Sequence, residues 1–394
     1  MWLSQIFQVT LLNLRNLKER AASSLVAVIG IAGVVTIVVA VLSIAEGFRK
    51  TMNAAGAPDR AVVLRSGSAS EMISFFSGDS VRLIRGGPGV AQGDLGPVAS
   101  AELFVIIDLP KRTTGTTANV PLRGVEPAAF QVRPELKIVE GRKFNTGTRE
   151  LVVGRSAQRE FAGLDLGSVL KLGANDWTVV GVFDAGGSLT ESEIWCDARV
   201  LQPAYRRGNS FQAVYVKLQT PRALSEYRRA LLTDPRLNVN VQRESEYLAS
   251  QSEALAGFIT FLGSAIAIIM GAGAAFAALN TMYTAVASRS REIATLRALG
   301  FNRGPVVISV LAEALLLGLL GGVLGAAAAY YLFDGFTTST MNWQSFSQVA
   351  FAFAVTPRLL ATAVIYALTL GLVGGVLPAW RAARLPISQA LREL

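Results

Sequence analysis

Four long runs of this sequence are almost free of charged residues, and they limit what the chain can fold into. They comprise residues 21–45, 253–287, 305–333 and 359–380. A helix of about 20 apolar residues crosses the roughly 30 Å of hydrocarbon in a bilayer. The second run is longer than a bilayer requires, so part of it should project as a stalk. In a chain that is 51% hydrophobic and only 16% charged, these runs predict a membrane protein with four transmembrane helices.

Charge is distributed unevenly among the segments that join these runs. Residues 1–20, 288–304 and 381–394 together hold ten Lys/Arg and three Asp/Glu residues, whereas residues 46–253 hold 26 and 23. Loops rich in Lys and Arg stay on the cytoplasmic side of a membrane. We therefore expect both termini and residues 288–304 in the cytoplasm, and the large segment outside. The net charge of +9 then reflects topology, and no nucleic-acid partner is expected.

The N-terminal segment has a helical apolar pattern of its own. Residues 1–20 should form a cytoplasmic amphipathic helix at the membrane interface, although packing on a partner protein is an open alternative. The run at 21–45 is too long for the apolar part of a typical signal peptide, which favours an uncleaved anchor.

Short, alternating, β-branched stretches replace the helical pattern between residues 46 and 252. Two β-α-β units at opposite ends of this segment predict one α+β subdomain that is split by an insertion. The insertion, at about 120–210, contains three strand-like stretches and should be a β-rich subdomain. The β-α-β units comprise residues 61–65, 79–85 and 99–109, and residues 211–218, 221–232 and 238–242; the insertion strands are 150–154, 168–172 and 177–183.

Several kinds of chemistry are excluded by what the chain contains. It has no histidine and a single cysteine, Cys196, so an intrachain disulfide, a Cys/His metal site and a Ser-His-Asp triad are impossible. The glycine-rich stretch at 86–93 lacks the lysine of a nucleotide-binding loop. Glu191 and Glu193 could bind a cation, but a solvated turn is the preferred interpretation; the turn at 184–188 is a flexible loop or a ligand-binding loop. We expect no catalysis, metal or cofactor in this chain.

Residues 288–304 have the pattern of a short helix. Ile293, Leu296 and Leu299 recur every three residues and predict one apolar side, and Gly300 is placed to end the helix. Such a helix on the cytoplasmic side of a membrane protein suggests that something there must push or hold it.

The third and fourth apolar runs carry two further features. Glu313 is an intramembrane acid, which is either functional or paired with Arg289 or Arg381 near the headgroups. Pairs of glycines four residues apart allow helix backbones to approach closely, within one protomer or between two. These glycines are Gly318, Gly321, Gly322, Gly325, Gly371 and Gly375. Residues 334–358 should form a short polar loop outside.

The stretches at 291–300 and 378–392 resemble the MacB/FtsX-like permease family, the membrane subunits of type VII ABC systems. The resemblance extends to residues 313–325 and, in the large segment, to 122–125 and 180–182. It implies an α-helical membrane protein with four transmembrane helices plus an α+β periplasmic domain, in which a split β-α-β porter-like subdomain carries an inserted β-rich subdomain. It also implies a multi-pass protein of the bacterial inner membrane.

The same resemblance implies how such a protein works. A homodimer would bind two copies of a cytoplasmic ABC ATPase, which is expected to be a separate polypeptide carrying ATP and Mg. A coupling helix would contact this ATPase and move the periplasmic domain, expelling antibiotics, peptides or lipids with a periplasmic adaptor and an outer-membrane channel. An FtsX-like regulator of a cell-wall hydrolase and a lipoprotein-release permease are alternatives. The coupling residues carried over from the family are Arg291, Glu292, Ile293, Leu296, Arg297, Leu299 and Gly300.

Overall fold

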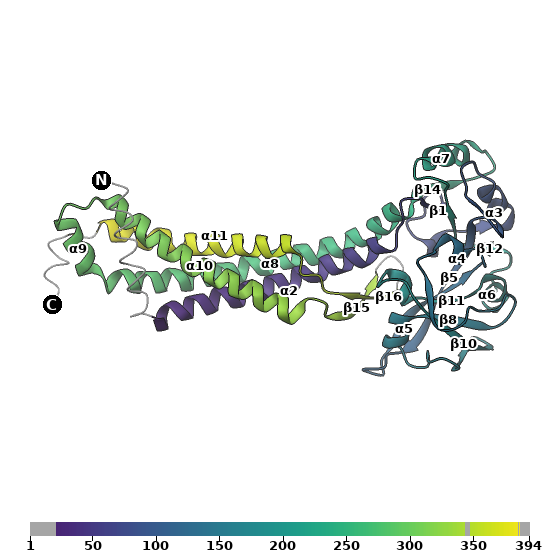
Figure 1. Ribbon diagram of the computed structural model, residues 1–394, viewed down its shortest axis with the longest axis horizontal. Helices are drawn as coiled ribbons and strands as arrows, with labels where there is room; N and C mark the ends of the chain where they lie inside the picture. The colour runs from purple at the N-terminus through teal and green to yellow at the C-terminus, as the bar shows by residue number, and fades with distance from the viewer. Residues whose placement is uncertain (1–20, 343–346, 385, 387–394) are drawn as a thin grey trace. The chain divides into compact units, whose positions relative to one another are not determined.

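The computed structural model describes residues 21–342, 347–384 and 386 (Figure 1). The predicted N-terminal helix at 1–20 and most of the tail at 381–394 lie outside the described residues. The chain divides into two compact units. We call Gly47–Ala256 together with Thr337–Ala352 the α/β unit, and the remaining residues the helical unit.

Four of the described helices are long and apolar enough to cross a membrane. They cover the four predicted runs and extend beyond each of them, by the largest amount in two cases. One helix continues nine residues past the predicted end at 45, and another begins nine residues before the predicted start at 253. These helices are α2 (Ala21–Ala54), α8 (Glu244–Ala287), α10 (Arg303–Phe333) and α11 (Pro357–Arg384). At 1.5 Å per residue, the 44 residues of α8 span about 66 Å, which is the length expected of a span with a stalk.

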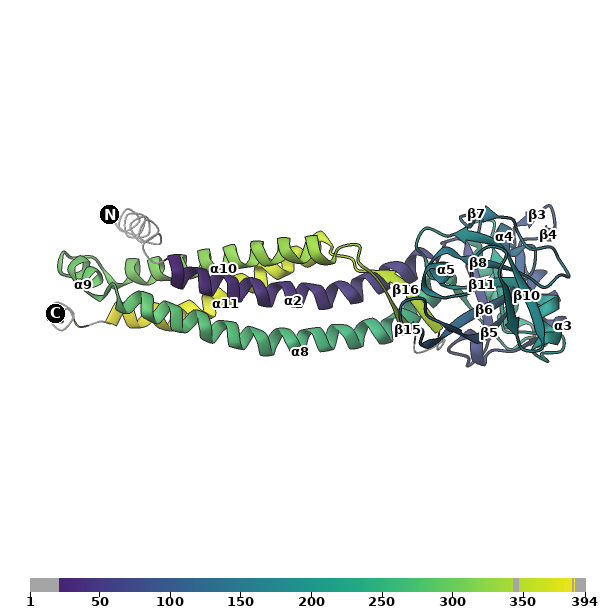
Figure 2. The same ribbon diagram turned by 90° about the horizontal axis from the view of Figure 1, so that it is seen from below.

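The helical unit is held together by apolar side chains from all four helices. Val28 of α2, Met282 of α8, Val310 of α10 and Ala379 of α11 belong to one buried cluster. Helices α10 and α11 pack along each other most extensively. The short helix α9 (Ser290–Ala298) lies at the end of this unit where α8 ends and α10 begins (Figure 2).

The segment at 334–358, expected as a short polar loop, contains two strands that the sequence did not predict. Strands β15 (Thr337–Asn342) and β16 (Ser347–Ala352) pair antiparallel over six residues. Threonines dominate the first strand, while Val349 and Phe351 of the second strand are buried. β-branched and aromatic residues favour strands once one face is covered.

The α/β unit is built around one ten-stranded sheet, whose strand order is β14-β1-β13-β5-β6-β11-β8-β10-β7 with β9 paired to β10. The strands are β1 (Arg60–Arg65), β5 (Ala99–Pro110), β6 (Thr117–Val125), β7 (Lys137–Gly141), β8 (Glu150–Gly154), β9 (Val169–Leu172), β10 (Asn175–Asp184), β11 (Ile194–Asp197), β13 (Ala213–Lys217) and β14 (Val239–Arg243). Short strands β2 (Phe76–Ser77) and β12 (Ser210–Phe211) pair with each other, as do β3 (Gln92–Gly93) and β4 (Gly96–Pro97). The helices are α3 (Gly78–Arg85), α4 (Ala129–Val132), α5 (Arg155–Glu160), α6 (Ala198–Ala204) and α7 (Ala223–Thr233), with short 3-10 turns η2 (Glu71–Ile73) and η3 (Leu189–Ser192).

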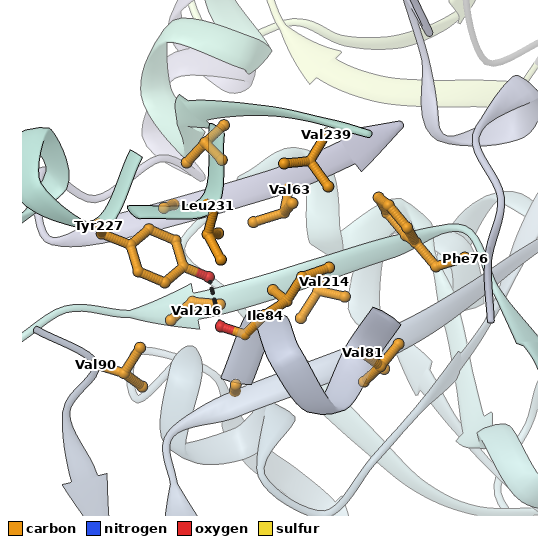
Figure 3. Packing of buried hydrophobic residues seen from close by; sticks show 14 of the residues in the cluster. Val63, Phe76, Val81, Ile84, Val90, Val214, Val216, Tyr227, Leu231 and Val239 are labelled. Atoms are coloured by element: carbon orange, nitrogen blue, oxygen red, sulfur yellow. Dashed lines mark hydrogen bonds between the residues drawn. The ribbon is translucent and has the colours of Figure 1, made fainter. Parts of the chain in front are cut away.

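The first half of the sheet is the predicted β-α-β pair. Its core lies between β14, β1 and β13 on one side and α3 and α7 on the other (Figure 3). The hydroxyl of Tyr227 on α7 donates to the carbonyl of Ile84 on α3 at 3.0 Å, so the two helices are joined directly. Burial raises the pKa of Tyr227 well above its ordinary value, which keeps this hydroxyl a donor.

The second half contains the predicted β-rich insertion, but it is not separate from the first half. Strand β5 pairs with β13 through residues 99–102 and with β6 through residues 103–110. One continuous strand therefore belongs to both halves of the sheet. The insertion has its own core around Trp177 and Cys196, both fully buried.

Candidate functional site

Helix α9 is a short helix with a well-defined end. The amide of Gly300 donates to the carbonyl of Arg297 at 3.1 Å, and the amide of Phe301 donates to that of Leu296 at 3.1 Å. This is the Schellman arrangement, which needs a left-handed residue after the helix. Gly300 supplies it, with φ of +96°, and the chain can therefore reverse from α9 into α10.

One face of α9 packs on the other helices and one faces outward. Ile293 is 8% exposed and lies in the cluster with Val306 and Val310, whereas Leu299 is 73% exposed. The sequence places Ile293, Leu296 and Leu299 on one apolar side, and for Leu299 this prediction is wrong. Three residues turn a helix by about 300°, so a spacing of three drifts around the axis. The exposed residues of α9 and its end include Arg291, Glu292, Thr295 and Leu299; Leu296 and Arg297 are half-buried.

The base of α9 is joined to α10 by a buried ion pair. Nη2 of Arg289 donates to both carboxylate oxygens of Glu313, at 2.6 and 2.7 Å, and both side chains are 4% exposed. Both side chains line a small cavity of about 20 Å³, together with apolar side chains such as Val310. Of the two partners considered for Glu313, the structure shows Arg289. Arg381 lies instead over the ring of Tyr283, 5.5 Å from its centroid.

A second polar contact joins α9 to α11. Nη1 of Arg297 donates to the carbonyl of Ala383 at 3.0 Å. Together with the Arg289–Glu313 pair and the packing of Ile293, this contact fixes α9 to α8, α10 and α11. A force applied to the outward face of α9 would reach those helices through polar contacts as well as apolar ones.

All six predicted packing glycines face another helix of the same chain. Gly318 and Gly322 face α11, Gly321 and Gly325 face α2, and Gly371 and Gly375 face α10. A Cβ atom at Gly371 would lie 2.6 Å from the backbone oxygen of Ala314, closer than a real Cβ contact. Such approach of backbones is what small residues permit in helices that pack within lipid.

A network of buried charges lies in the α/β unit, and the sequence analysis missed it. Arg123 donates to Glu193 through Nε and Nη2, both at 2.8 Å, and its Nη1 reaches Glu71 at 2.5 Å and Glu102 at 3.0 Å. Buried charges persist only when paired in this way, because desolvation costs several kcal/mol per ion. The members, all at most 9% exposed, are Arg60, Arg123, Arg133, Glu71, Glu102, Glu193 and Glu244.

This network reaches the point where α2 and α8 meet the sheet. Arg60 begins β1 shortly after α2, and Glu244 begins α8; Nε of Arg60 lies 2.5 Å from Oε2 of Glu244. Arg133 lies between Glu244, at 3.7 Å, and Glu102, at 2.7 Å. The signal in the sequence was a charged residue in an apolar strand, as at Glu102 and Arg123, but only the fold shows which charges meet.

The carboxylate of Glu191 is hydrogen-bonded to the neighbouring loop at 184–188. Oε1 of Glu191 accepts from the amides of Ala185 at 2.8 Å and Gly187 at 2.7 Å, and the Ser156 hydroxyl donates to Oε2 at 3.1 Å. Glu191 is 5% exposed and Glu193 4%, so the prediction of a solvated turn is wrong. Within the 184–188 loop, the amides of Ala185 and Gly187 therefore donate to Glu191, and the amide of Gly186 donates to Asp184 at 2.9 Å. No acidic cluster able to hold a metal occurs among the residues that the structure describes.

Two family matches cover most of the chain. Residues 24–233 match the MacB-like periplasmic core domain, and residues 256–387 match the FtsX-like permease C-terminal domain. A set of long apolar helices, a short helix fixed among their ends and an α/β unit define a membrane-embedded permease. The chain belongs to the MacB/FtsX-like family of ABC transporter permeases.

Relatives agree with this assignment at low identity. The macrolide export ATP-binding/permease protein MacB of Pasteurella multocida is 25% identical over 73% of this chain, and that of Chromobacterium violaceum is 26% identical over 72%. The chain spans only 45% of the length of either relative. The uncharacterized ABC transporter permease YknZ of Bacillus subtilis is 23% identical, over 81% of this chain and 79% of its own.

Solved structures of similar outer regions are also known. The extracellular domain of YknZ from Gram-positive bacteria has a TM-score of 0.35 at 17% identity, covering 47% of this chain and 100% of its own. The periplasmic region of MacB from Actinobacillus actinomycetemcomitans has a TM-score of 0.38 at 12% identity, covering 50% and 94%.

Proposed function

We propose that this chain is the permease subunit of a MacB-like ABC exporter. In this proposal a cytoplasmic ATPase pushes on α9, and the resulting displacement of the helices moves the periplasmic α/β unit. Periplasmic substrates such as antibiotics, peptides or lipids are then expelled through an adaptor and an outer-membrane channel. The observation that carries the proposal is the attachment of α9, through Arg289–Glu313 and Arg297, to α10 and α11.

The proposed topology has four spans, with both termini in the cytoplasm and the α/β unit in the periplasm of an inner-membrane protein. Support comes from the four long apolar helices and from the match to a periplasmic core domain. The concentration of arginines near α9 and at the end of α11 agrees with the positive-inside rule.

In this proposal the helical unit transmits a displacement and does not form a channel for the substrate. The six packing glycines bring α10 into close contact with α2 and α11. Arg289 and Glu313 bind each other at 2.6 Å. They do not form part of a row of described charges along the helices. Close contact of this kind transmits force and leaves little room for a polar substrate.

We further propose two copies of this chain and two of a separate ATPase, which would bind ATP and Mg. Support for a separate ATPase comes from the names of the relatives: MacB is an ATP-binding/permease protein, whereas YknZ, which this chain covers more fully, is a permease. The face of α9 that is open to such a partner combines Arg291 and Glu292 with the exposed Leu299.

The FtsX-like match of residues 256–387 also supports a second candidate. In that alternative the same displacement regulates a periplasmic cell-wall hydrolase, or releases lipoproteins, and nothing is exported. The exporter and the regulator differ in which added molecule changes the ATPase rate of the intact complex. Small apolar substrates should change the rate of an exporter, and a purified hydrolase should change that of a regulator.

The coupling role is tested on the outward face of α9. Leu299→Asp and Arg291→Glu should reduce co-purification of the ATPase with the full chain at least tenfold, because both side chains are exposed and support no packing. Arg358→Glu, an equal charge reversal at the start of α11, is the matched control. Changes at Ile293 are unsuitable, since a charge there would disrupt the core. Unchanged ATPase binding by both α9 variants would refute the coupling role.

A further inference from the structure

The β15–β16 hairpin has two sets of contacts, one at each end of its strands. It is the segment between α10 and α11, and its base and its strands belong to different units. The contacts of the base lie within the helical unit, and those of the strands lie within the α/β unit. Each set is specific enough to restrain the hairpin.

At the base, the hairpin continues rigidly from the two helices. The carboxylate of Asp334 accepts from the amide of Val355 at 2.9 Å, and the amide of Phe353 donates to the carbonyl of Phe336 at 2.9 Å. The rings of Phe336 and Phe353 meet edge to face, 5.6 Å apart. The end of α10 and the start of α11 are therefore clamped together where the hairpin begins.

Along its strands, the hairpin is attached to the β-rich half of the α/β unit. The hydroxyl of Ser339 accepts from Nζ of Lys111 at 2.9 Å and donates to Glu160 at 2.7 Å, so it completes the Lys111–Glu160 ion pair. The amide of Ala350 donates to the hydroxyl of Ser192 at 3.0 Å. Strand β16 packs against β6, α5 and η3.

The hairpin also contacts the ends of α2 and α8 that belong to the α/β unit. The ring of Phe351 meets that of Phe48 edge to face at 5.7 Å, and both are buried. Nδ2 of Asn342 donates to Oε1 of Gln251 at 3.3 Å, and these two side chains are 2% and 5% exposed. Buried amides bonded in this way are costly to separate, because each would lose its partner.

We infer that the β15–β16 hairpin is a link through which displacement of α10 and α11 moves the α/β unit, with Ser339, Asn342 and Phe351 as its positioning residues. This inference rests on the proposed function. It adds a path through α10 and α11: α9 is joined to α10 by Arg289–Glu313, α10 leads into the hairpin, and the hairpin is fixed on the insertion and on the ends of α2 and α8 that belong to the α/β unit. The hairpin and the α/β unit move as one body.

The test compares a weakened link with a locked one in the complex of the full chain and its co-purifying ATPase, reconstituted in nanodiscs. The weakened variant combines Asn342→Ala and Phe351→Ala; the locked variant joins Ser192→Cys to Ala350→Cys by oxidation. A bimane label at Leu232→Cys, where the side chain is 56% exposed, reports on the α/β unit; Cys196 is buried and stays unlabelled. Met341→Ala, at a residue that is 39% exposed on the same hairpin, is the matched control.

The inference predicts opposite results for the two variants. On addition of Mg-ATP and vanadate, the fluorescence change should fall at least fivefold in the weakened variant. It should be retained in the locked variant and in Met341→Ala, while ATPase binding and basal hydrolysis stay at the wild-type level in all three. Thermal unfolding of the weakened variant, followed by fluorescence of the buried tryptophans, distinguishes loss of the link from loss of the fold; Ser339→Ala is the milder substitute if the α/β unit unfolds.

Two results would overturn this inference and leave the proposed function intact. A weakened variant that responds like wild type would show that α2 and α8 suffice, and a locked variant that no longer responds would show that the hairpin must slide on the insertion. If no ATPase associates with the wild-type chain, the proposed function fails and this inference fails with it.

Discussion

The buried pair of Arg289 and Glu313 gives the most direct test of how α9 is attached. Arg289→Met leaves the carboxylate of Glu313 without a cation in an apolar setting, where both groups are 4% exposed. Breaking a buried pair in this way costs about 3–5 kcal/mol, which is at least about a 150-fold change in the unfolding equilibrium. Glu313→Leu should have an effect of similar size, because it leaves the guanidinium unpaired.

The double variant Arg289→Met with Glu313→Leu separates stability from coupling. Replacing both charges by apolar groups of similar size is often neutral, within about 1 kcal/mol. The double-mutant cycle should therefore give an interaction energy of at least about 5 kcal/mol in magnitude, because the cost of each single variant is almost absent from the double variant. The stable double variant should still lose ATP-driven movement of the α/β unit, since apolar contact lacks the directional bond between α9 and α10.

The assay is reversible unfolding of the full chain in mixed detergent and dodecyl sulfate micelles, followed by circular dichroism of the helices. Arg381→Met is the matched control, because Arg381 contacts only the face of Tyr283 among the interactions described, and it should cost less than about 1 kcal/mol. If Arg289→Met changed the free energy of unfolding by less than about 0.5 kcal/mol, its cost would be only that of breaking an exposed ion pair. That result would refute the reasoning.

Three further outcomes are expected. Gly371→Ala should destabilise the helical unit by about 1–3 kcal/mol, because its Cβ would lie 2.6 Å from a backbone oxygen of α10. Gly273→Ala, whose Cβ would have nothing within 4 Å, should be neutral in the same unfolding assay. Equal effects of the two substitutions would contradict the packing role of Gly371. The Arg142 hydrogen bond lowers the pKa of Glu150 to about 2. This carboxylate therefore stabilises the fold above its ordinary pKa and loses that contribution as pH falls toward 2; Glu150→Gln should cost about 1 kcal/mol at pH 7 and almost nothing near pH 2 in thermal unfolding. Burial raises the pKa of Cys196, so an impermeant maleimide should label it only after unfolding and from outside the cell; rapid labelling of the native chain would show that the insertion core is open.

The long-range pattern of the chain was predictable because it depends on composition over many residues. Four apolar runs predict four helices wherever they pack, and the glycine at position 300 ends α9 because its φ of +96° suits a residue without a side chain. The β-α-β units were recognisable from alternation and turns. The six glycines predicted as packing residues each face another helix, although their spacing does not name which helix.

Features that depend on contacts between distant segments were not predictable. Arg123 and Glu193 are separated by 70 residues, and a charge in an apolar strand does not show which distant charge it meets. Glu191 was interpreted as solvated, since nothing local shows that the loop amides of 185–187 surround its carboxylate. The hairpin at 337–352 was missed because its polar first strand is stabilised by partners elsewhere in the chain, such as Lys111.

The continuity of β5 sets where this protein can be recombined with its relatives. An exchange of residues 120–210 would divide β6, because residues 120–124 pair with 103–107 while residues 117–119 pair with 108–110. A mismatched β5–β6 ladder leaves unpaired strand edges, which invite aggregation. A transplant that carries the later part of β5 along with the insertion keeps the β5–β6 ladder whole. Hybrid permeases built on that junction, rather than on the apparent limits of the insertion, are the ones to expect in folded form.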